Sequence, residues 1–262
     1  MKYKLLVIGL GVVGMTACQK VIDLKLNNRA GQYVIEGNVT NLPGPYQVKI
    51  GKTGEVTADY TFQGVSQATV SIRDNAGNTE TLAEVQPGIY QTHSLQGVEG
   101  RTYYLNISVG DKTFTASSVM PAQVNLDSLY IEEVYNFSKM VKAVVPVFTD
   151  PVGQGNSYRV NETINGVLDK NLYYQNDDFT DGKTSAFALL RPDPDSTLHV
   201  KDNVSVEMQC IDKAMYKYWY SVDQSSTGDG DALPANPVTN IVGGALGYFS
   251  AHTSQTKTIV VK

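Results

Sequence analysis

The sequence has few of the residues that carry most enzyme chemistry. Its 262 residues include only three histidines and two cysteines. His93, His199 and His252 are far apart and lack the paired spacing of a zinc site, so we expect them on loops or strand surfaces. No Gly-x-Ser-x-Gly motif of a nucleophilic serine occurs. The sequence therefore indicates a protein that is not an enzyme.

Charged residues are also scarce, and positive charge is not concentrated anywhere along the chain. They make up 18% of the sequence, and the net charge is −5. Nucleic-acid binding needs a basic face that neutralises phosphates, so this class is excluded. Hydrophobic residues reach 42%, enough for a packed core, and 16 tyrosines favour half-buried β-surfaces.

Cys18 follows a segment that is typical of a secretory signal. Lys2 and Lys4 form a short positive region, and the apolar stretch after them is shorter than the roughly 20 residues that span a bilayer. The residues before Cys18 also resemble the lipobox of bacterial lipoproteins. We predict a signal peptide at 1–17 and covalent diacylglycerol and fatty acyl groups on Cys18, with no other cofactor. The alternative is a disulfide between Cys18 and Cys210.

The residues after Cys18 bear on which membrane holds the anchor. Gln19 stands where an Asp often retains lipoproteins in the inner membrane, so we expect the outer membrane. Lys20 fits a surface-export signal of some Bacteroidota lipoproteins, whereas Val21 and Ile22 do not. The sequence leaves open whether the protein faces the periplasm or the cell surface.

Three glycines in the same segment offer a rival interpretation. Gly9, Gly11 and Gly14 spell the G-x-G-x-x-G fingerprint of dinucleotide-binding folds. That fingerprint needs a helix directly after it and a repeated βαβ pattern. The following residues show no helical stripe, so the signal peptide is the preferred interpretation.

Alternating hydrophobicity dominates the rest of the chain and predicts a mostly β fold. Tyr103, Leu105, Ile107 and Val109 share one face of a strand, which ends in a two-residue hairpin turn at 110–111. Evenly spaced strands of this kind favour an immunoglobulin-like β-sandwich. We place this sandwich at 30–121, a tether at 18–29, and a second β-rich domain at 122–262, with a linker around Met120.

One segment of the second domain breaks the strand period. Its apolar residues recur at helical spacing, namely Ile211, Met215, Tyr218, Trp219 and Val222. Asp212 is suited to cap this short amphipathic helix or to supply a first-turn acid. Cys210 lies where a strand meets the helix, and we expect a buried structural thiol there.

Taken together, these motifs resemble an uncharacterised Bacteroidota outer-membrane lipoprotein family, domain of unknown function 4249. The resemblance covers KVIDL after the lipobox, YVIEGNVTNLPGP, GRTYYLNISVGDKTFTASSVMP, NDDFTDGK and VEMQCIDKAMYKYWYSV. It implies an outer-membrane lipoprotein with an immunoglobulin-like N-terminal part. Members tend to be encoded near TonB-dependent outer-membrane receptors, so a β-barrel receptor is an expected partner. No catalytic residues are established for the family.

Two acidic loops are weak candidates for calcium. One contains Asp177, Asp178 and Asp181 before a glycine, and calcium prefers several oxygens from such a compact loop. The other contains the acidic residues Asp223, Asp229 and Asp231. Neither matches the EF-hand spacing, and solvated acidic turns are the alternative interpretation.

Three further patterns suggest surface roles. Ser128 and Ser196 lie in Asp-Ser-Leu and Asp-Ser-Thr triplets that resemble a Bacteroidota O-glycosylation sequence, with plain turns as the alternative. Tyrosines 173, 174, 216, 218 and 220 with Trp219 supply aromatic surface for a binding patch, or else for core packing.

The leading functional hypothesis is an accessory binding component of a TonB-dependent transport system, with an unknown ligand. The alternative is a structural or adhesive envelope lipoprotein without a transport partner. Both rest on the predicted anchor and the predicted β modules, because fold alone does not separate them.

Overall fold

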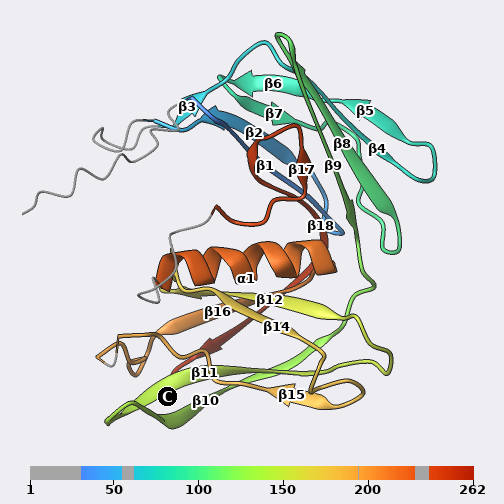
Figure 1. Ribbon diagram of the computed structural model, residues 1–262. Coiled ribbons are helices and arrows are strands. Elements are labelled where there is room, and N and C mark those ends of the chain that lie inside the picture. The colour runs from blue at the N-terminus through green and yellow to red at the C-terminus, as the bar shows by residue number, and fades with distance from the viewer. Residues whose placement is uncertain (1–30, 55–61, 194, 228–235) are drawn as a thin grey trace, which may run out of the picture.

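The computed structural model describes residues 31–54, 62–193, 195–227 and 236–262. Within them the chain forms two β modules with one α-helix between them (Figure 1). The prediction of a mostly β chain with a single short helix is confirmed. The predicted signal peptide 1–17, the tether 18–29 and Cys18 lie outside the described residues, as do the glycine fingerprint, Asp229 and Asp231.

The first module is a sandwich of two sheets. Its first sheet contains β1 (Tyr33–Thr40), β2 (Gln47–Lys52), β3 (Gln63–Gly64), β6 (Ala83–Gln86), β7 (Ile89–Gln91) and the first half of β18 (Leu246–Val260). Its second sheet has the order β17 (Ile241–Val242), β9 (Lys112–Val119), β8 (Thr102–Val109), β4 (Thr69–Asp74), β5 (Thr79–Thr81). Apolar side chains from both sheets fill the space between them and form one buried core.

The β8–β9 hairpin follows the sequence-based prediction. Tyr103, Leu105 and Ile107 all point into the core and are at most 2% exposed. Val109 pairs with Lys112 across the two-residue turn, in which Gly110 has a φ of 58°. Glycine adopts this left-handed conformation without a steric penalty, so the turn fits the twist of the two strands.

The second module packs two sheets around a separate core. One sheet contains β10 (Leu126–Asn136), β11 (Lys139–Thr149) and β15 (Thr184–Ala186). The other contains β12 (Ser157–Ile164), β13 (Val167–Leu168), β14 (Tyr173–Asn176), β16 (Asn203–Cys210) and the second half of β18. The prediction of a β-rich second part is confirmed.

The long last strand, β18, belongs to both modules. Residues 246–252 pair in parallel with β1, and residues 253–260 pair antiparallel with β16. One continuous sheet therefore runs through both modules. Gly247 permits the close parallel pairing, because a Cβ at this position would lie 2.0 Å from the carbonyl oxygen of Ile35.

This topology differs from the predicted division at 121/122. The segment 236–252 completes the first module, where Phe249 and Ala251 are fully buried in its core. Met120, predicted to lie in a linker, is also fully buried in that core. The physical reason is that pairing between segments more than 200 residues apart leaves no local signal in hydrophobic periodicity.

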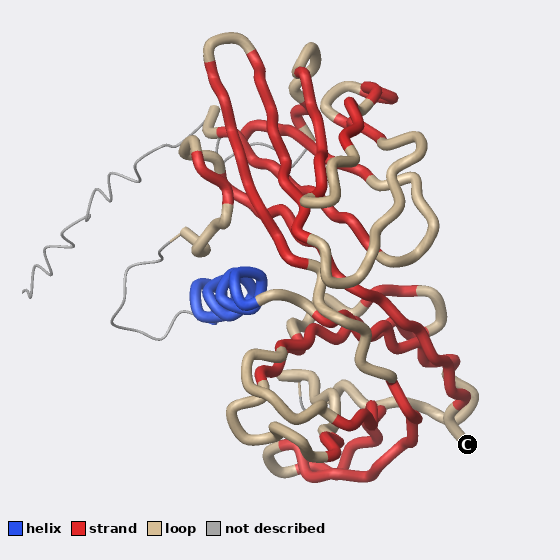
Figure 2. Tube along the Cα trace, turned by 90° about the vertical axis from the view of Figure 1, so that its right-hand side faces the viewer, coloured by secondary structure: helices blue, strands red, loops and turns tan. Residues whose placement is uncertain are grey.

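Helix α1 (Lys213–Thr227) lies between the modules and packs on β12, β14 and β18 (Figure 1). Figure 2 shows the helix viewed along its axis, beside the junction at which β18 passes from the first module to the second. Asp212 caps the helix as predicted, because its Oδ1 accepts a hydrogen bond from Met215 N at 2.9 Å. Its Oδ2 accepts bonds from Ser118 Oγ and Val119 N, which connect the helix start to β9. Among the described residues, no helix is long and apolar enough to cross a membrane.

Candidate functional site

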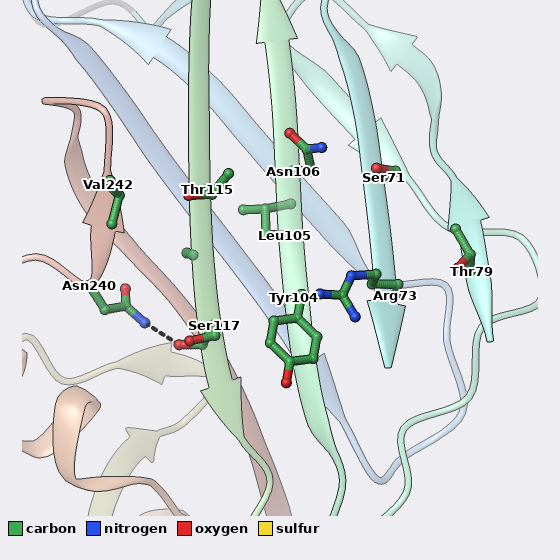
Figure 3. A pocket seen from close by; sticks show the side chains of 11 residues that line it. Ser71, Arg73, Thr79, Tyr104, Leu105, Asn106, Thr115, Ser117, Asn240 and Val242 are labelled. Carbon is green, nitrogen blue, oxygen red and sulfur yellow. Dashed lines mark hydrogen bonds between the residues drawn. The ribbon is translucent and has the colours of Figure 1, made fainter. Parts of the chain in front are cut away.

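The outer face of the five-stranded sheet carries a shallow groove with a volume of about 320 Å³ (Figure 3). Alternate residues of each strand point outward because side chains in a strand alternate between the two faces. The inward positions, such as Val70 and Ile72 on β4, are fully buried. The outward positions on β4, β5, β8 and β9 are almost all polar.

The strand register sets the outward side chains in two rows across the sheet. In the first row Arg73 lies opposite Thr79 on one side and Tyr104 on the other. Tyr104 in turn lies opposite Ser117. The guanidinium carbon of Arg73 is 3.9 Å from the centroid of the Tyr104 ring, which is a cation–π contact (Figure 3).

The second row lies two residues further along each strand. Asn106 lies opposite Ser71 and Thr115, and Thr115 lies opposite Val242 at the sheet edge. The two rows are roughly 7 Å apart, because a strand rises about 3.4 Å per residue. Together the two rows form the surface called here the groove.

Five polar side chains of the groove make no hydrogen bond to other described residues. This applies to the side-chain hydroxyls and amide of Ser71, Thr79, Asn106, Thr115 and Ser117. Asn240 differs, since its Nδ2 donates hydrogen bonds to the carbonyl oxygens of Ser117 at 3.2 Å and Phe249 at 2.7 Å. The groove thus offers hydrogen-bond donors and acceptors to a ligand, next to an asparagine, Asn240, that is held in place by its own hydrogen bonds.

The charge of the groove is opposite to that of the chain. Arg73 is the only charged side chain among the described residues that line it, and no carboxylate lies there. The nearest acidic neighbour along β4, Asp74, points inward, is 2% exposed and is paired with Arg101 at 2.8 Å. The groove can therefore accept an anionic group without repulsion from its own lining.

A second polar cluster lies in the second module and is largely buried. Glu162 on β12 is 1% exposed and pairs with Arg191 Nη2 at 2.8 Å. Arg191 also contacts Asp169 at 3.3 Å, and Tyr173 donates a hydrogen bond to Asp169 at 3.0 Å. Burial raises the pKa of Glu162 to about 7, and the charge of Arg191 opposes this rise.

A third polar cluster lies where β18 passes between the modules. Ser250 Oγ is 2.9 Å from Nδ1 of His252, and both residues are at most 4% exposed. Glu207 on β16 accepts hydrogen bonds from Ser254 and Asn161 at 2.6 and 2.8 Å. Burial lowers the pKa of His252 to about 4, although the negative charge of Glu207 opposes this. The Ser250–His252 pair is thus neutral and shielded from solvent.

The structure corrects the expectation that the three histidines lie on the surface. His93 and His199 are exposed, but His252 is buried at the junction. The sequence around His252 alternates weakly because β18 is covered on both sides at this point. Cys210 lies at the end of β16 as predicted and is 3% exposed; burial raises the pKa of its thiol.

The predicted aromatic surface divides into separate clusters. Tyr174, Tyr216 and Tyr220 form one cluster, with ring centroids 5.7 to 6.4 Å apart. Tyr218 and Trp219 form another with Tyr248, a β18 residue that was not singled out from the sequence. Arg159 lies 3.6 Å from the centroid of the Trp219 ring. Tyr173 belongs instead to the Glu162 cluster.

The aspartates of the candidate calcium loop bond to backbone and amide groups. Asp177 Oδ2 accepts hydrogen bonds from Gly155 N and Asn156 N at 2.6 and 2.9 Å. Asp181 Oδ1 accepts one from Gly153 N, and Asp178 Oδ2 accepts one from Asn176. Among the residues that the structure describes, no group of three or more Asp, Glu, His or Cys side chains is arranged to hold a metal ion.

The two serines of the candidate glycosylation triplets lie in different settings. Ser128 is exposed on β10, next to a β-bulge, so the alternative of a plain turn is wrong for it. Ser196 lies in a turn, where its backbone N donates to the carbonyl oxygen of Asp193 at 3.0 Å. Ser128 is therefore accessible to modification, whereas Ser196 is half-buried.

The groove was not found from the sequence. Each strand contributes only one or two ordinary outward-facing residues, such as Ser71 and Arg73 on β4. The one local signal is that the outward positions of β4, β8 and β9 are almost free of carboxylates. Only the register of five strands shows that these residues lie together.

Comparison with models of known protein families places the chain in a family. The model of a family described as "Domain of unknown function (DUF4249)" matches residues 19–258. A search of the curated proteins found no match.

Proposed function

The chain belongs to the DUF4249 family, and from this premise we propose that it is a lipid-anchored outer-membrane protein that serves as an accessory binding component of a TonB-dependent transport system. In this proposal the protein is not an enzyme. Cys18 carries the acyl chains, the groove binds a ligand, and the second module contacts the β-barrel receptor.

The groove is the observation that carries the proposal. It is open, it lies on a five-stranded sheet, and its side-chain hydroxyls and the Asn106 amide make no hydrogen bond to other described residues. A site built on strands holds its side chains more accurately than a site on loops. By contrast, the buried Ser250–His252 pair has no access for a substrate, and its imidazole is neutral.

Two hairpins of the second module support a protein partner there. Tyr135 and Phe137 on the β10–β11 hairpin are 74% and 83% exposed, and Val167 and Leu168 on β13 are 71% and 58% exposed. Large apolar side chains exposed in this way are common at protein–protein contacts. Phe137 also has a φ of 55°, which is unfavourable for a bulky residue.

The test is purification of the tagged, acylated protein from outer membranes in gentle detergent, with mass spectrometry of the copurified proteins. We expect a stoichiometric TonB-dependent β-barrel. A variant with Tyr135→Ser and Phe137→Ser is expected to lose the barrel and keep its melting temperature. Val85→Ser is the matched control, because Val85 is 49% exposed on the first module and does not line the groove.

Recovery of the wild-type lipoprotein without a barrel would contradict the transport role. It would favour a structural or adhesive envelope protein instead. Cys18→Ser tests the anchor separately. We expect this variant to lack the acyl chains and to leave the membrane fraction, whereas an unchanged distribution would contradict anchoring through Cys18.

A further inference from the structure

The groove has a chemical character that narrows the class of its ligand. We propose that it binds an acidic oligosaccharide, with Arg73 contacting a sugar carboxylate and the two rows of polar side chains contacting sugar hydroxyls. This inference rests on the proposed binding function and names the ligand class of the same site.

The carboxylate contact follows from how Arg73 is held. Its guanidinium lies 3.9 Å above the Tyr104 ring, and its strand position is fixed by pairing with Thr79 and Tyr104. Guanidinium groups stack on aromatic rings and still present their N–H fork to a carboxylate. The contact with Tyr104 therefore preorganises Arg73 for a two-point hydrogen bond, which reduces the entropy lost on binding.

The hydroxyl contacts follow from the second row and from Ser117. Ser71, Asn106 and Thr115 lie side by side on neighbouring strands, roughly 5 Å apart in the direction across the sheet. Serine and threonine hydroxyls both donate and accept, and an asparagine amide does both through separate atoms. This mixture matches sugar hydroxyls, which also donate and accept.

Two other ligand classes fit the groove less well. A neutral oligosaccharide would leave Arg73 without an anionic partner, although Arg73 is the only charged side chain in the described lining. An extended peptide binds to sheets mainly by pairing with a free strand edge. Tyr104 and Asn106 lie on β8, whose backbone is already paired with β4 and β9 on both sides.

The test uses the acylated full chain in detergent and a panel of acidic oligosaccharides, namely trigalacturonate, trimannuronate, a hyaluronan tetrasaccharide and sialyllactose. Each probe is matched by its methyl ester, which keeps the skeleton and removes the negative charge. Isothermal titration is expected to show binding of at least one acid. We expect its ester to bind about tenfold or more weakly, because a hydrogen-bonded charge is lost.

Substitutions in the groove test whether the stronger binding of the acid over its ester arises at this site. Arg73→Ala is expected to bind the acid and its ester equally weakly, and Asn106→Ala is expected to weaken both. Lys49→Ala is the matched control, because Lys49 is an exposed cation on the outer face of the opposite sheet. Its binding is expected to equal that of the wild type.

Three outcomes would overturn the inference. They are no binding of any acid, equal binding of acid and ester by the wild type, or unchanged binding by Arg73→Ala with an unchanged melting temperature. The result is separable from the proposed function. A copurified barrel without acid binding would contradict only the ligand class, and acid binding without a barrel would contradict only the transport role.

Discussion

The groove and the two buried clusters around Glu162 and His252 contain similar residue types. In the groove these side chains are open to solvent, whereas in the clusters they are packed against one another. The groove combines arginine, tyrosine, serine, threonine and asparagine on an open sheet face, where the side-chain hydroxyls and the Asn106 amide bond to no other described residue. The clusters around Glu162 and His252 combine the same kinds of group with carboxylates, but these groups are buried or half-buried and bond mainly to one another. Polar composition therefore does not identify a binding site; the availability of the polar atoms does.

The comparison has an energetic consequence. A buried polar group that loses its partner pays the full cost of its removal from water, whereas an exposed group returns to water. Substitutions in the buried clusters should therefore change the free energy of unfolding, and matched substitutions in the groove should leave it nearly unchanged. The following variants test this difference, in order of decreasing effect.

The largest effect is expected for Arg191→Ala. The substitution leaves the Glu162 carboxylate, whose side chain is fully buried, without its cation at 2.8 Å. Removing one partner of a buried ion pair destabilises a protein by about 3–5 kcal/mol. Arg73→Ala is the matched control, and a change within about 0.5 kcal/mol is expected because Arg73 is exposed. Urea unfolding at a pH well above 7, where Glu162 is ionised, measures both, and equal effects would contradict the comparison.

The second largest effect is expected from His252, which should make the free energy of unfolding depend on pH. Its pKa is about 4 in the folded protein and 6.5 ordinarily, so the unfolded chain takes up a proton first as the pH falls. The stability that neutral His252 contributes is complete above pH 6.5 and is lost as the pH falls through about 4. The loss amounts to about 3 kcal/mol. The His252→Gln variant should therefore lose less unfolding free energy than the wild type when the pH falls from 6.5 to about 4, as urea unfolding at several pH values would show.

Glu162 should act in the opposite direction in nearly the same window. Its pKa is about 7 in the folded protein against 4.5 ordinarily, so the folded chain binds the extra proton. The stability that protonated Glu162 contributes is complete below pH 4.5 and is lost as the pH rises through about 7. Glu162→Gln should therefore lose less stability than wild type on going from acid to neutral pH. The difference in unfolding free energy between variant and wild type should therefore change with pH in opposite directions for His252→Gln and Glu162→Gln. A change in the same direction for both variants would contradict the assignment of these pKa values.

A smaller effect is expected for Asp212→Ala, which tests the contact between the modules. Loss of a helix N-cap costs about 0.5–2 kcal/mol. Here the same carboxylate also accepts hydrogen bonds from Ser118 Oγ and Val119 N of the first module. Asp212→Asn keeps an acceptor at the cap and is expected to recover part of the loss. Hydrogen exchange should show faster opening at the start of α1, and a change confined to β9 would contradict the capping role.

How much of the fold and of the groove could be predicted from the sequence depends on how far apart in the sequence the contacting residues lie. The β8–β9 hairpin and the Asp212 cap were predicted, because their signals lie within a few residues. The use of β18 in both modules was not, because its parallel partner β1 lies more than 200 residues away. The groove was missed for the same reason, since Arg73 on β4 and Val242 on β17 come to lie on one face only through the order of four strands.

The smallest change in stability is expected when a hydroxyl is removed from the groove. Thr115→Val keeps the shape and the β-branched side chain of an exposed residue, so the free energy of unfolding should change by less than about 0.5 kcal/mol. Ser254→Ala removes a hydroxyl that is 2% exposed and donates to Glu207 at 2.6 Å. Leaving that carboxylate short of a donor should cost about 1–3 kcal/mol. Thr115→Val should instead weaken binding of the acidic oligosaccharide, which the same titration detects. A groove variant that destabilises the fold as much as Ser254→Ala would show that the groove hydroxyls are structural, and the distinction between the two regions would fail.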